Sequence, residues 1–522
     1  MAGTDTASVQ NPMILTFDVG TQSARAILVD RQGNIVDKVK ICYDEPYYSL
    51  HPNWAEQSPE AYWNVMCKAA QELKRRQEVL WDQIIAVTCT CIRGTAVCFD
   101  KEGKPVRDAI VWLDKRCEEN LPPLTAKTAM LFKLAKLTDA IHTLRTHMYC
   151  NWLAVNEPEN WARTDKYAFL STYFNVKFTG VMKDSTANMC GILPYDTKNR
   201  RWYPRNDIHR ELYLVDDSKL IELVRPGSVL GHITAQAAAE TGAPEGLPFI
   251  VTGSDKMCET LGLSCTRNDT AAISLGTLSS IQVPSKRFFA MQMILPPFPS
   301  LLEDYLNEIQ TYRGFWLVSW FKEQFAHGEV EEAKRMGCSA EDILDIHLND
   351  VPPGCDGLIM QPTLTPDAVT PHARGVFLGI TDIHTRMHFF RAIIEGIGFT
   401  LYEGLKALEK AGHTSVKRTF IAGGGSTSGE ICQIAADILG IPVCRIQTDE
   451  ASALGSSLLA YVTMGVHPDV DTAIAEMVHL KDQFDPDPQI HLFYERLYGQ
   501  VYSKIFKSVL KLYRSIDDII LN

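Results

Sequence analysis

Apolar and polar positions along the chain predict strands and helices in turn. Residues 14–29 form an apolar run, a tight Gly-Thr turn and a second apolar run, which predicts a β-hairpin. Residues 271–283 repeat this pattern about half a chain later. Further apolar runs predict strands at 84–91, 247–252, 357–360 and 419–422.

Helix signals lie between these strands. Ser58 is placed to cap a helix that has Pro59 at its first position and extends to about Val79. Residues 120–240 have a mostly helical pattern with polar breaks, and residues 286–350 are irregular and then helical. Strands that alternate with helices indicate an α/β fold.

Two further helices are predicted in the second half of the chain. The first covers 384–411, and Gly412 closes it. The second follows the glycine run 423–425, carries an apolar stripe at helical spacing, and stops at Gly440.

The repeated hairpin indicates two related domains. A hairpin turn that exposes backbone N–H groups and hydroxyls can cradle phosphate, and two facing hairpins would hold a polyphosphate from both sides. Only the first copy carries an acid, Asp18, which could hold a metal ion. We therefore expect a nucleotide–metal cleft between an N-terminal domain, 1–258, and a C-terminal domain, 259–522.

Charge and composition restrict the class of protein. The 522 residues are 46% hydrophobic and 22% charged, which is typical of a folded multi-domain protein. A net charge of −12 without a long basic run argues against a nucleic-acid partner. No apolar stretch reaches the ~18 residues that span a bilayer, and residues 1–12 lack an apolar signal core. The 14 cysteines include no C-x-x-C pair, so we expect a cytoplasmic protein with no membrane partner.

Polar residues follow the predicted strands at three places. Asp255 comes just after the strand 247–252 and could accept a proton from a substrate hydroxyl; a helix N-cap is its alternative role. Asp18, beside the first turn, could coordinate Mg²⁺ or stabilise the turn. Arg93 follows the strand 84–91 and could hydrogen-bond a polar substrate, or it is a solvated arginine at a strand end.

The run Gly423-Gly424-Gly425 precedes a predicted helix. Its spacing to Gly429 superficially matches a P-loop, but Glu430 stands where that motif has lysine, and a carboxylate there would repel phosphate. The backbone of a glycine turn before a helix can still approach a base or a phosphate closely. A tight strand-to-helix turn is an equal alternative from these residues alone.

Together, a series of short motifs resembles the FGGY carbohydrate kinases, the family of glycerol kinase and xylulokinase. The first hairpin matches the family's D-x-G-T-x-S-x-R motif from Asp18 to Arg25. The likeness covers about residues 13–470, and the order and spacing of its motifs make it specific. The other segments that carry it are 54–59, 109–116, 253–255, 275–277, 374–379, 422–426 and 449–455.

This resemblance implies two actin-like (ribonuclease H-like) domains with an interdomain cleft. It implies transfer of the γ-phosphoryl group of ATP to a hydroxyl of a pentulose-like ketose or a polyol, with Asp255 as the base and Mg²⁺ held at Asp18. The sugar would lie on the N-terminal domain and ATP mainly on the C-terminal one. The residues implied in nucleotide binding are Thr21, Gln22, Arg25, Gly276, Thr277, Gly424, Gly425 and Ser428.

Substrate-side positions depart from the best-known relatives. Arg93 matches the arginine of glycerol kinases, but Gly94 follows it in place of glutamate, and Lys256 follows Asp255 in place of asparagine or glutamine. We expect Arg93 and Lys256 in the sugar pocket, where two cations favour an acceptor rich in hydroxyls, a carbonyl or a carboxylate. Lys256 could alternatively face a phosphate of ATP.

Two other classes of function stay open from the sequence. A nucleotide-driven clamp of the actin/Hsp70 type also has paired hairpins, although no peptide-binding domain follows here. A catalytically weak sugar-binding regulator is the other class, and the presence of both Asp18 and Asp255 argues against it. Whether the chain is a monomer or a homodimer also stays open.

Overall fold

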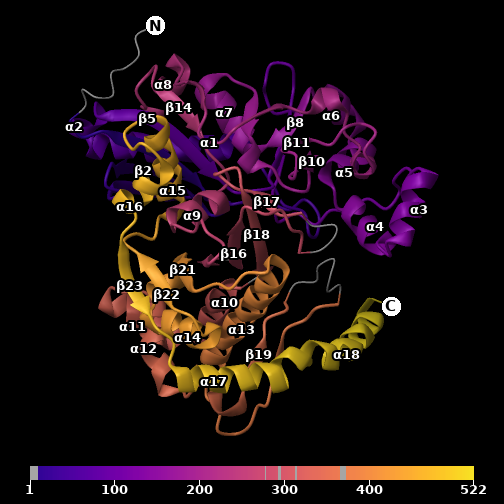
Figure 1. Ribbon diagram of the computed structural model, residues 1–522, viewed down its shortest axis with the longest axis vertical. Helices are drawn as coiled ribbons and strands as arrows, with labels where there is room; N and C mark the ends of the chain where they lie inside the picture. Colours follow the sequence, from indigo (N-terminus) through magenta and orange to yellow (C-terminus); the bar gives the residue numbers. More distant parts are fainter. Residues whose placement is uncertain (1–9, 277, 292–295, 312–313, 365–371, 522) are drawn as a thin grey trace. The chain divides into compact units, whose positions relative to one another are not determined.

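The chain forms two compact units (Figure 1). The computed structural model describes residues 10–276, 278–291, 296–311, 314–364 and 372–521. Unit 1 comprises Met1–Ser264, Lys286–Leu306 and Glu450–His479, and unit 2 comprises Cys265–Ser285, Asn307–Asp449 and Leu480–Asn522. The chain therefore passes from one unit to the other more than once.

A six-stranded sheet forms the centre of unit 1, in the order β13–β14–β5–β1–β2–β3. Strands β1 and β2 are the antiparallel arms of the predicted first hairpin, and β5 and β14 continue the sheet in parallel with β1. The hairpin and the strands after it are thus confirmed. The strands are β1 (Met13–Val19), β2 (Ser23–Asp30), β3 (Ile35–Cys42), β5 (Ile84–Cys91), β13 (Val229–His232) and β14 (Pro248–Val251).

The second large sheet has the order β17–β18–β16–β15–β21–β22–β23. Strands β15 and β16 form the predicted second hairpin, and β21 and β22 continue in parallel with β15. Strand β18 lies within 286–350, where the sequence pattern predicts no strand. The strands are β15 (Thr270–Leu275), β16 (Ser279–Ser285), β17 (Phe298–Pro299), β18 (Tyr305–Thr311), β21 (Arg418–Ala422), β22 (Val443–Ile446) and β23 (Leu480–Phe484).

Both sheets follow one plan. The order β2–β1–β5–β14–β13 in the first corresponds to β16–β15–β21–β22–β23 in the second. In each, an antiparallel hairpin is followed by two parallel strands and an antiparallel edge strand. This correspondence confirms the α/β fold and explains why the Gly-Thr hairpin occurs twice.

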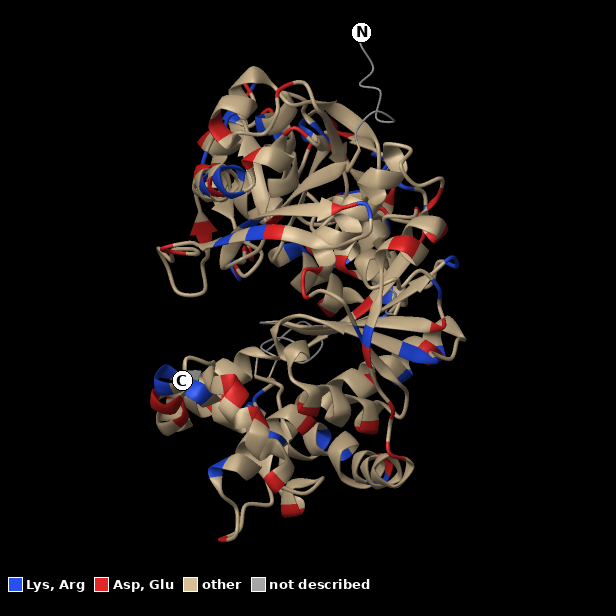
Figure 2. Ribbon diagram, turned by 90° about the vertical axis from the view of Figure 1, so that its left-hand side faces the viewer, with Lys and Arg blue, Asp and Glu red and all other residues tan. Residues whose placement is uncertain are grey.

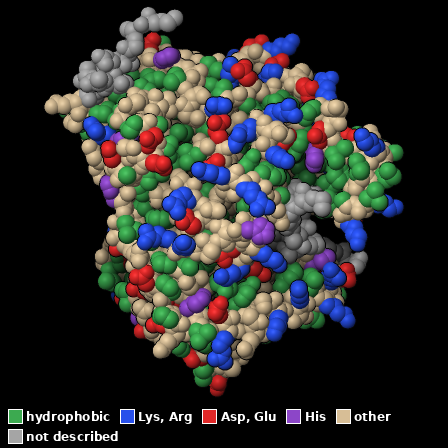
Figure 3. All heavy atoms as spheres, viewed as in Figure 1, with side chains coloured by type: hydrophobic (Ala, Val, Ile, Leu, Met, Phe, Trp, Pro, Cys, Tyr) green, Lys and Arg blue, Asp and Glu red, His purple; other side chains and the backbone are tan. Residues whose placement is uncertain are grey.

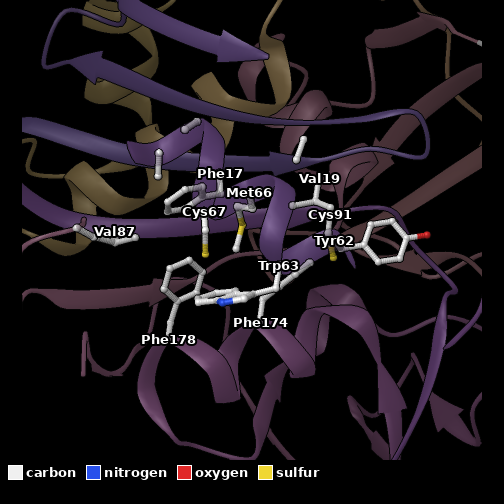
Figure 4. Packing of buried hydrophobic residues seen from close by; sticks show 14 of the residues in the cluster. Phe17, Val19, Tyr62, Trp63, Met66, Cys67, Val87, Cys91, Phe174 and Phe178 are labelled. Carbon is white, nitrogen blue, oxygen red and sulfur yellow. The ribbon is translucent and has the colours of Figure 1, made fainter. Parts of the chain in front are cut away.

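Aromatic side chains fill the space between the first sheet and its helices (Figure 4). Trp63, on α1 (Pro59–Arg76), meets Phe178 at the end of α7 (Leu170–Thr179) with ring centroids 5.0 Å apart. Phe178 in turn lies 5.2 Å from Phe17 on β1. Because Phe17 alternates with Asp18 along the strand, one face of β1 is anchored in the core while Asp18 points to the other.

Helix α15 (Ala451–Thr463) belongs to unit 1 and packs against the first sheet and α9 (Asp255–Gly262). Its Ser457 hydroxyl lies 2.7 Å from that of Thr16, and its Tyr461 hydroxyl donates to the carbonyl of Val29. A Cβ on Gly455 would lie 1.9 Å from a backbone carbonyl oxygen of α9, so glycine is what allows the two helices to touch.

Helix ends agree with the predictions in part. Ser58 occupies the N-cap position of α1, but its side chain makes no capping hydrogen bond, and α1 ends at Arg76. The predicted end of α13 (Arg386–Gly412) is wrong by one residue, because His413 and not Gly412 takes the left-handed conformation, with φ at 50°. Gly440 ends α14 (Gly429–Leu439) as predicted.

Shorter elements complete the two units. A small sheet in the order β4–β7–β6–β8 comprises β4 (Glu56–Gln57), β7 (Ala109–Ile110), β6 (Ala96–Phe99) and β8 (Lys166–Phe169). The other helices of unit 1 include α3 (Ala126–Leu134), α4 (Thr138–Thr146), α5 (Tyr149–Asn156), α6 (Pro158–Arg163), α8 (Ala235–Thr241) and α16 (Val470–Met477). Those of unit 2 include α10 (Trp316–Phe325), α11 (His327–Met336), α12 (Ala340–Ile346), α17 (Pro488–Leu497) and α18 (Ser503–Leu521).

Charged residues of both signs are interspersed within each unit (Figure 2), and the face shown in Figure 3 carries basic and acidic side chains mixed with apolar ones. Across the described residues, no helix combines the length and apolar character that crossing a membrane requires. All the cysteines lie in the described part of the chain, and each is a free thiol.

Candidate functional site

Three sequence-predicted residues lie at one edge of the first sheet. Strands β1, β5 and β14 are parallel, so their carboxyl ends meet at the same edge. Asp18 is the second-last residue of β1, Arg93 follows β5, and Asp255 begins the helix after β14. The parallel arrangement therefore brings together side chains that are far apart in the sequence.

Asp18 is held by a cation from the neighbouring strand. Asp18 and Arg25 are direct partners in the antiparallel pairing of β1 and β2, and Arg25 Nη1 donates to Asp18 Oδ2 at 2.9 Å. Asp18 is nearly buried, with 7% of its surface exposed. Burial raises the pKa of Asp18 to about 6; Arg25 opposes this rise, while the charges of Glu450 and Asp255 add to it.

Asp255 is the first residue of α9 and is not its N-cap, which is Ser254. The N-cap alternative for Asp255 is therefore wrong. Its Oδ1 accepts the backbone N–H of Lys256 at 2.8 Å. Burial raises the pKa of Asp255 above its ordinary value, while the charges of Lys256 and Arg93 oppose that rise.

The two predicted substrate cations have different surroundings. Lys256 Nζ pairs with Glu259 Oε2 at 2.7 Å, one turn along α9, and Glu259 is buried. The Arg93 guanidinium lies over the ring of Phe298, 3.9 Å from its centroid. Two cations and a second acid, Glu259, thus act on Asp255, and the sequence alone indicates only the cations.

The turn of the first hairpin is supported from outside the hairpin. Trp112 Nε1 donates to the hydroxyl of Thr21 at 2.9 Å. Gln22 is exposed, and its backbone carbonyl accepts the N–H of Tyr43. Within the turn, the Gly20 N–H donates to the carbonyl of Ser23. Thr21 is therefore fixed in place, while Gln22 faces solvent.

Two of the family-like segments meet in a buried ion-pair cluster. Arg116 bonds Asp114 at 2.8 Å and Glu56 at 2.6 Å, and its guanidinium also contacts the rings of Trp54 and Trp152. The segments 54–59 and 109–116 therefore have a structural role. By fixing the chain on either side of Trp112, the cluster supports the indole that contacts Thr21.

Residues 423–425 form a glycine turn in unit 2, and its three glycines differ in conformation and in the space around them. Gly423 has φ at 92°, and a Cβ there would lie 2.6 Å from the carbonyl oxygen of Leu275. A Cβ on Gly425 would lie 2.3 Å from the ring of Phe315, whereas a Cβ on Gly424 would meet no atom within 4 Å. Gly424 is thus the exposed position at which another molecule can approach the backbone.

The remaining predicted nucleotide residues surround this turn and the second hairpin. Ser428 is the N-cap of α14, where its Oγ accepts the N–H of Ile431. Gly276 closes the second hairpin by donating to the carbonyl of Leu278, as Gly20 closes the first. Arg445 donates to carbonyl oxygens of the turn at residues 426 and 427. Thr277 lies outside the described residues.

A magnesium–nucleotide complex fits the acids at the edge of the first sheet. Mg²⁺ usually binds through one or two carboxylates plus substrate phosphates, and not in a cage made by the protein alone. Within the described ranges, no group of three or more His, Cys, Asp or Glu side chains could hold a metal ion. A single buried carboxylate such as Asp18 therefore matches a metal that arrives with its nucleotide.

Sequence reasoning missed Glu450, Glu259, Phe298 and Phe315. Glu450 lies in a segment with a family-like pattern, but nothing in that pattern links it to the first hairpin. Glu259 could have been found, because it follows Lys256 at the i, i+3 spacing of helical ion pairs. Phe298 and Phe315 carry no signal in the sequence, since their contacts are with distant residues.

Comparison with known proteins gives a consistent result. Models of the FGGY family of carbohydrate kinases match residues 13–262 with the N-terminal domain and 271–464 with the C-terminal domain. The chain is 28% identical over 477 residues to the uncharacterized sugar kinase YgcE of Escherichia coli, covering 91% of this chain and 89% of that protein. It is 26% identical over 506 residues to the xylulose kinase of Staphylococcus epidermidis, covering 96% of this chain and 97% of that one.

The fold agrees with these matches. The ligand-bound xylulose kinase from Lactobacillus acidophilus aligns with a TM-score of 0.81 at 20% identity, over 97% of this chain and 100% of that chain. This likeness shows the two-domain actin-like (ribonuclease H-like) fold that the resemblance implies. The family models cover well over half of the chain. The chain therefore belongs to the FGGY family of carbohydrate kinases and is a sugar kinase.

Proposed function

We propose that this kinase transfers the γ-phosphoryl group of ATP to a hydroxyl of a pentulose-like ketose or a polyol. The observation that carries the proposal is the meeting of Asp18, Arg93 and Asp255 at one edge of the first sheet. We assign the sugar to the N-terminal domain, residues 1–258, and ATP mainly to the C-terminal domain, residues 259–522.

Asp255 takes the proton of the acceptor hydroxyl. We assign this step to Oδ2, because Oδ1 accepts the N–H of Lys256. A base works best when its pKa lies near the working pH, and burial raises the pKa of Asp255 in that direction. Positioning and charge neutralisation supply most of the catalysis in phosphoryl transfer, so the protein has little covalent chemistry to perform.

The phosphates are held by backbone groups and by residues of both hairpins. Mg²⁺, when bound with the nucleotide, neutralises developing charge on the phosphates. Asp18 would hold that metal, and Arg25, Thr21 and Gln22 would hold phosphate. Further binding groups are Gly276, Thr277, Gly424, Gly425 and Ser428. The exposed backbone at Gly424 supports the part of this proposal that concerns the nucleoside.

The charges around Asp255 favour a neutral acceptor. Lys256 pairs with Glu259, and the charge of Arg93 is opposed by that of Asp255. A pocket whose charges balance internally gains little from a carboxylate on the substrate, whereas hydroxyls and a carbonyl can accept hydrogen bonds from Arg93. We therefore favour a ketose or polyol over a sugar acid. Arg93 also disfavours glycerol, which is too small to satisfy a half-buried guanidinium.

A substrate profile tests this proposal. ADP release would be measured with D-xylulose, ribitol, glycerol and D-gluconate, for the wild type and for Arg93→Ala. We expect the highest kcat/KM with the pentulose or the pentitol, and a raised KM for that substrate in the variant. Best turnover with glycerol or gluconate, or a profile that Arg93→Ala leaves unchanged, would contradict it.

The alternative classes are less favoured. The family assignment supports a sugar kinase over a nucleotide-driven clamp. A regulator that only binds sugar would have no need of two buried or half-buried acids at the edge of one sheet, where their pKa values are raised. The cytoplasmic location stays a prediction from the sequence.

A further inference from the structure

Glu450 lies at the N-cap position of α15, within unit 1, and only 8% of its surface is exposed. Its Oε1 is 2.8 Å from Lys38 Nζ on β3 and 3.5 Å from Arg25 Nε on β2. Both cations thus lie on strands of the first hairpin and its neighbour. Glu450 therefore contacts the first hairpin and its neighbouring strand, although it lies more than four hundred residues later in the chain.

Arg25 bridges two acids. Its Nη1 donates to Asp18 at 2.9 Å, and its Nε edge faces Glu450. A guanidinium is planar, so fixing two of its nitrogens fixes the direction of the whole fork. Asp18, Arg25, Glu450 and Lys38 together carry two negative and two positive charges, and the set is neutral before any ligand binds.

The first turn of α15 also contacts Asp255, the other acid of the site. Ser452, two residues after Glu450, donates its hydroxyl to the backbone carbonyl of Asp255 at 3.2 Å. Close backbone contact between α15 and α9 at Gly455 and Gly262 keeps the two helices at a fixed separation. One helix N-terminus thus contacts both Arg25, the ion-pair partner of Asp18, and the helix that begins with Asp255.

We propose that Glu450 is a positioning residue for the phosphoryl transfer. By holding Arg25 and Lys38, it aims the Arg25 guanidinium and the Asp18 carboxylate at the magnesium–nucleotide complex. This inference rests on the proposed function, in which Asp18 holds the metal. It goes beyond that function, because Glu450 acts through Arg25 and does not itself touch a ligand.

A purely structural ion pair is the competing explanation. Removing one partner of a buried ion pair is commonly destabilising, because a buried charge is left without its counter-charge. Such a loss would lower the unfolding temperature. It would not change how much Mg²⁺ improves nucleotide binding, so that improvement separates the two explanations.

The experiment measures the binding of AMP-PNP by calorimetry, with Mg²⁺ and with EDTA. Wild type, Glu450→Gln and the matched control Glu222→Gln would be compared; Glu222 pairs with Lys183 on the exposed surface of the same unit. We expect Mg²⁺ to tighten binding to the wild type and to the control equally. In Glu450→Gln this gain should fall at least about fivefold, which corresponds to about 1 kcal/mol of lost coupling.

A double-mutant cycle tests the route through Arg25. In the Arg25→Gln background, Glu450→Gln should cause little further loss of the Mg²⁺-dependent gain. A full additional loss there would overturn the proposal, as would an unchanged gain in Glu450→Gln accompanied by a lower unfolding temperature.

Glu450→Asp is a milder variant that can be tested if Glu450→Gln does not fold. Glu450→Asp keeps the charge but shortens the reach to Arg25 and Lys38, so it should also reduce the Mg²⁺-dependent gain, and an unchanged gain would overturn the proposal. If wild type itself shows no gain with Mg²⁺, the proposed function fails and this inference fails with it. A wild-type gain that survives in the Glu450 variants overturns the positioning role alone.

Discussion

Asp18 combines burial with a nearby set of other acids. Its pKa is raised from the ordinary value of 3.8 to about 6, mainly by burial. The folded protein therefore binds a proton at Asp18 more tightly than the unfolded chain does, and ionising Asp18 in the folded state costs free energy. Arg25 offsets only part of this cost. Such local instability is common where a residue is kept for a ligand and not for the fold.

This arrangement predicts a pH-dependent effect of Asp18→Asn on stability. Below about pH 3, Asp18 is protonated in both states, and its ionisation gives no difference in stability between the variant and the wild type. As the pH rises from about 4 to about 6, the wild type loses up to about 3 kcal/mol of stability, because the unfolded chain ionises before the folded state does; asparagine removes that penalty. In EDTA at pH 7.5, the variant should therefore have the higher unfolding temperature.

Thermal unfolding of both proteins from pH 4.5 to pH 8 would check this sign. A variant that is less stable than wild type at pH 7.5, with a difference that does not depend on pH, would contradict the raised pKa. The same variant should need more Mg²⁺ for half-maximal turnover while its KM for sugar changes little. Collapse of sugar binding with unchanged metal dependence would contradict the role of Asp18.

Asp255 leads to a prediction about catalysis. Asp255→Asn keeps the size of the side chain and the oxygen that accepts the Lys256 N–H, so the variant should fold and bind ATP. Loss of the base should lower kcat by roughly 10²–10⁴. Steady-state ADP release, with nucleotide binding as the control, would measure this. Near-normal turnover would leave Asp255 with no part in the chemistry.

At the scale of elements, the contact between α9 and α15 predicts a sensitive glycine. Gly455→Ala would place a Cβ 1.9 Å from the Cys258 carbonyl oxygen and push apart the helices that carry Asp255 and follow Glu450. We expect a loss of at least about 2 kcal/mol in stability together with a fall in kcat. Thermal unfolding and ADP release would measure the two effects.

Gly328 supplies a matched control on another helix. A Cβ there would meet no atom within 4 Å, so Gly328→Ala should be neutral or stabilise by up to about 1 kcal/mol. If Gly455→Ala behaved like Gly328→Ala, the close packing of α9 on α15 would be wrong.

The glycine turn of unit 2 offers a second matched pair. Gly424→Ala should leave the unfolding temperature unchanged, since its Cβ enters open space, but should weaken ATP binding if the nucleotide lies against this backbone. Gly423→Ala should lower the unfolding temperature as well, because φ is 92° and Leu275 blocks the Cβ. Unchanged ATP affinity in Gly424→Ala would remove that residue from the nucleotide site.

Many elements could be predicted because their signals are local. The hairpins around residues 20 and 276 follow from two apolar runs and a Gly-Thr turn, and α14 follows from its apolar stripe and Gly440. The end of α13 could not be placed, because a histidine took the left-handed position beside an available glycine. Strand β18 could not be predicted because its pairing depends on β16, which belongs to a distant hairpin.

The candidate site could be predicted only where the sheet itself brings residues together. Parallel pairing of β1, β5 and β14 places Asp18, Arg93 and Asp255 at one edge, and the sequence reveals those strands. Glu450 reaches this edge through a helix that returns to unit 1 late in the chain. Glu259 balances the charge of Lys256, so the surroundings of Asp255 are less cationic than the sequence predicts.

At the scale of the whole molecule, the two related sheets carry different chemical groups. The first holds the acids, and the second holds the glycine turn, although both follow the same strand order. Asp18 has no acidic counterpart in the second Gly-Thr hairpin, where Ser274 precedes Leu275 and Gly276. The two Gly-Thr hairpins therefore differ at the position that the proposed function assigns to the metal.

Acceptor-dependent ADP release tests the transfer of a phosphoryl group to a carbohydrate most directly. ATP and Mg²⁺ would be incubated with the wild-type protein, with and without D-xylulose or ribitol, and both ADP and phosphorylated acceptor would be quantified. We predict that one of these acceptors raises ADP release at least about a hundredfold, with one phosphorylated sugar formed per ADP. ADP release that no carbohydrate stimulates, or that yields only inorganic phosphate, would contradict the account.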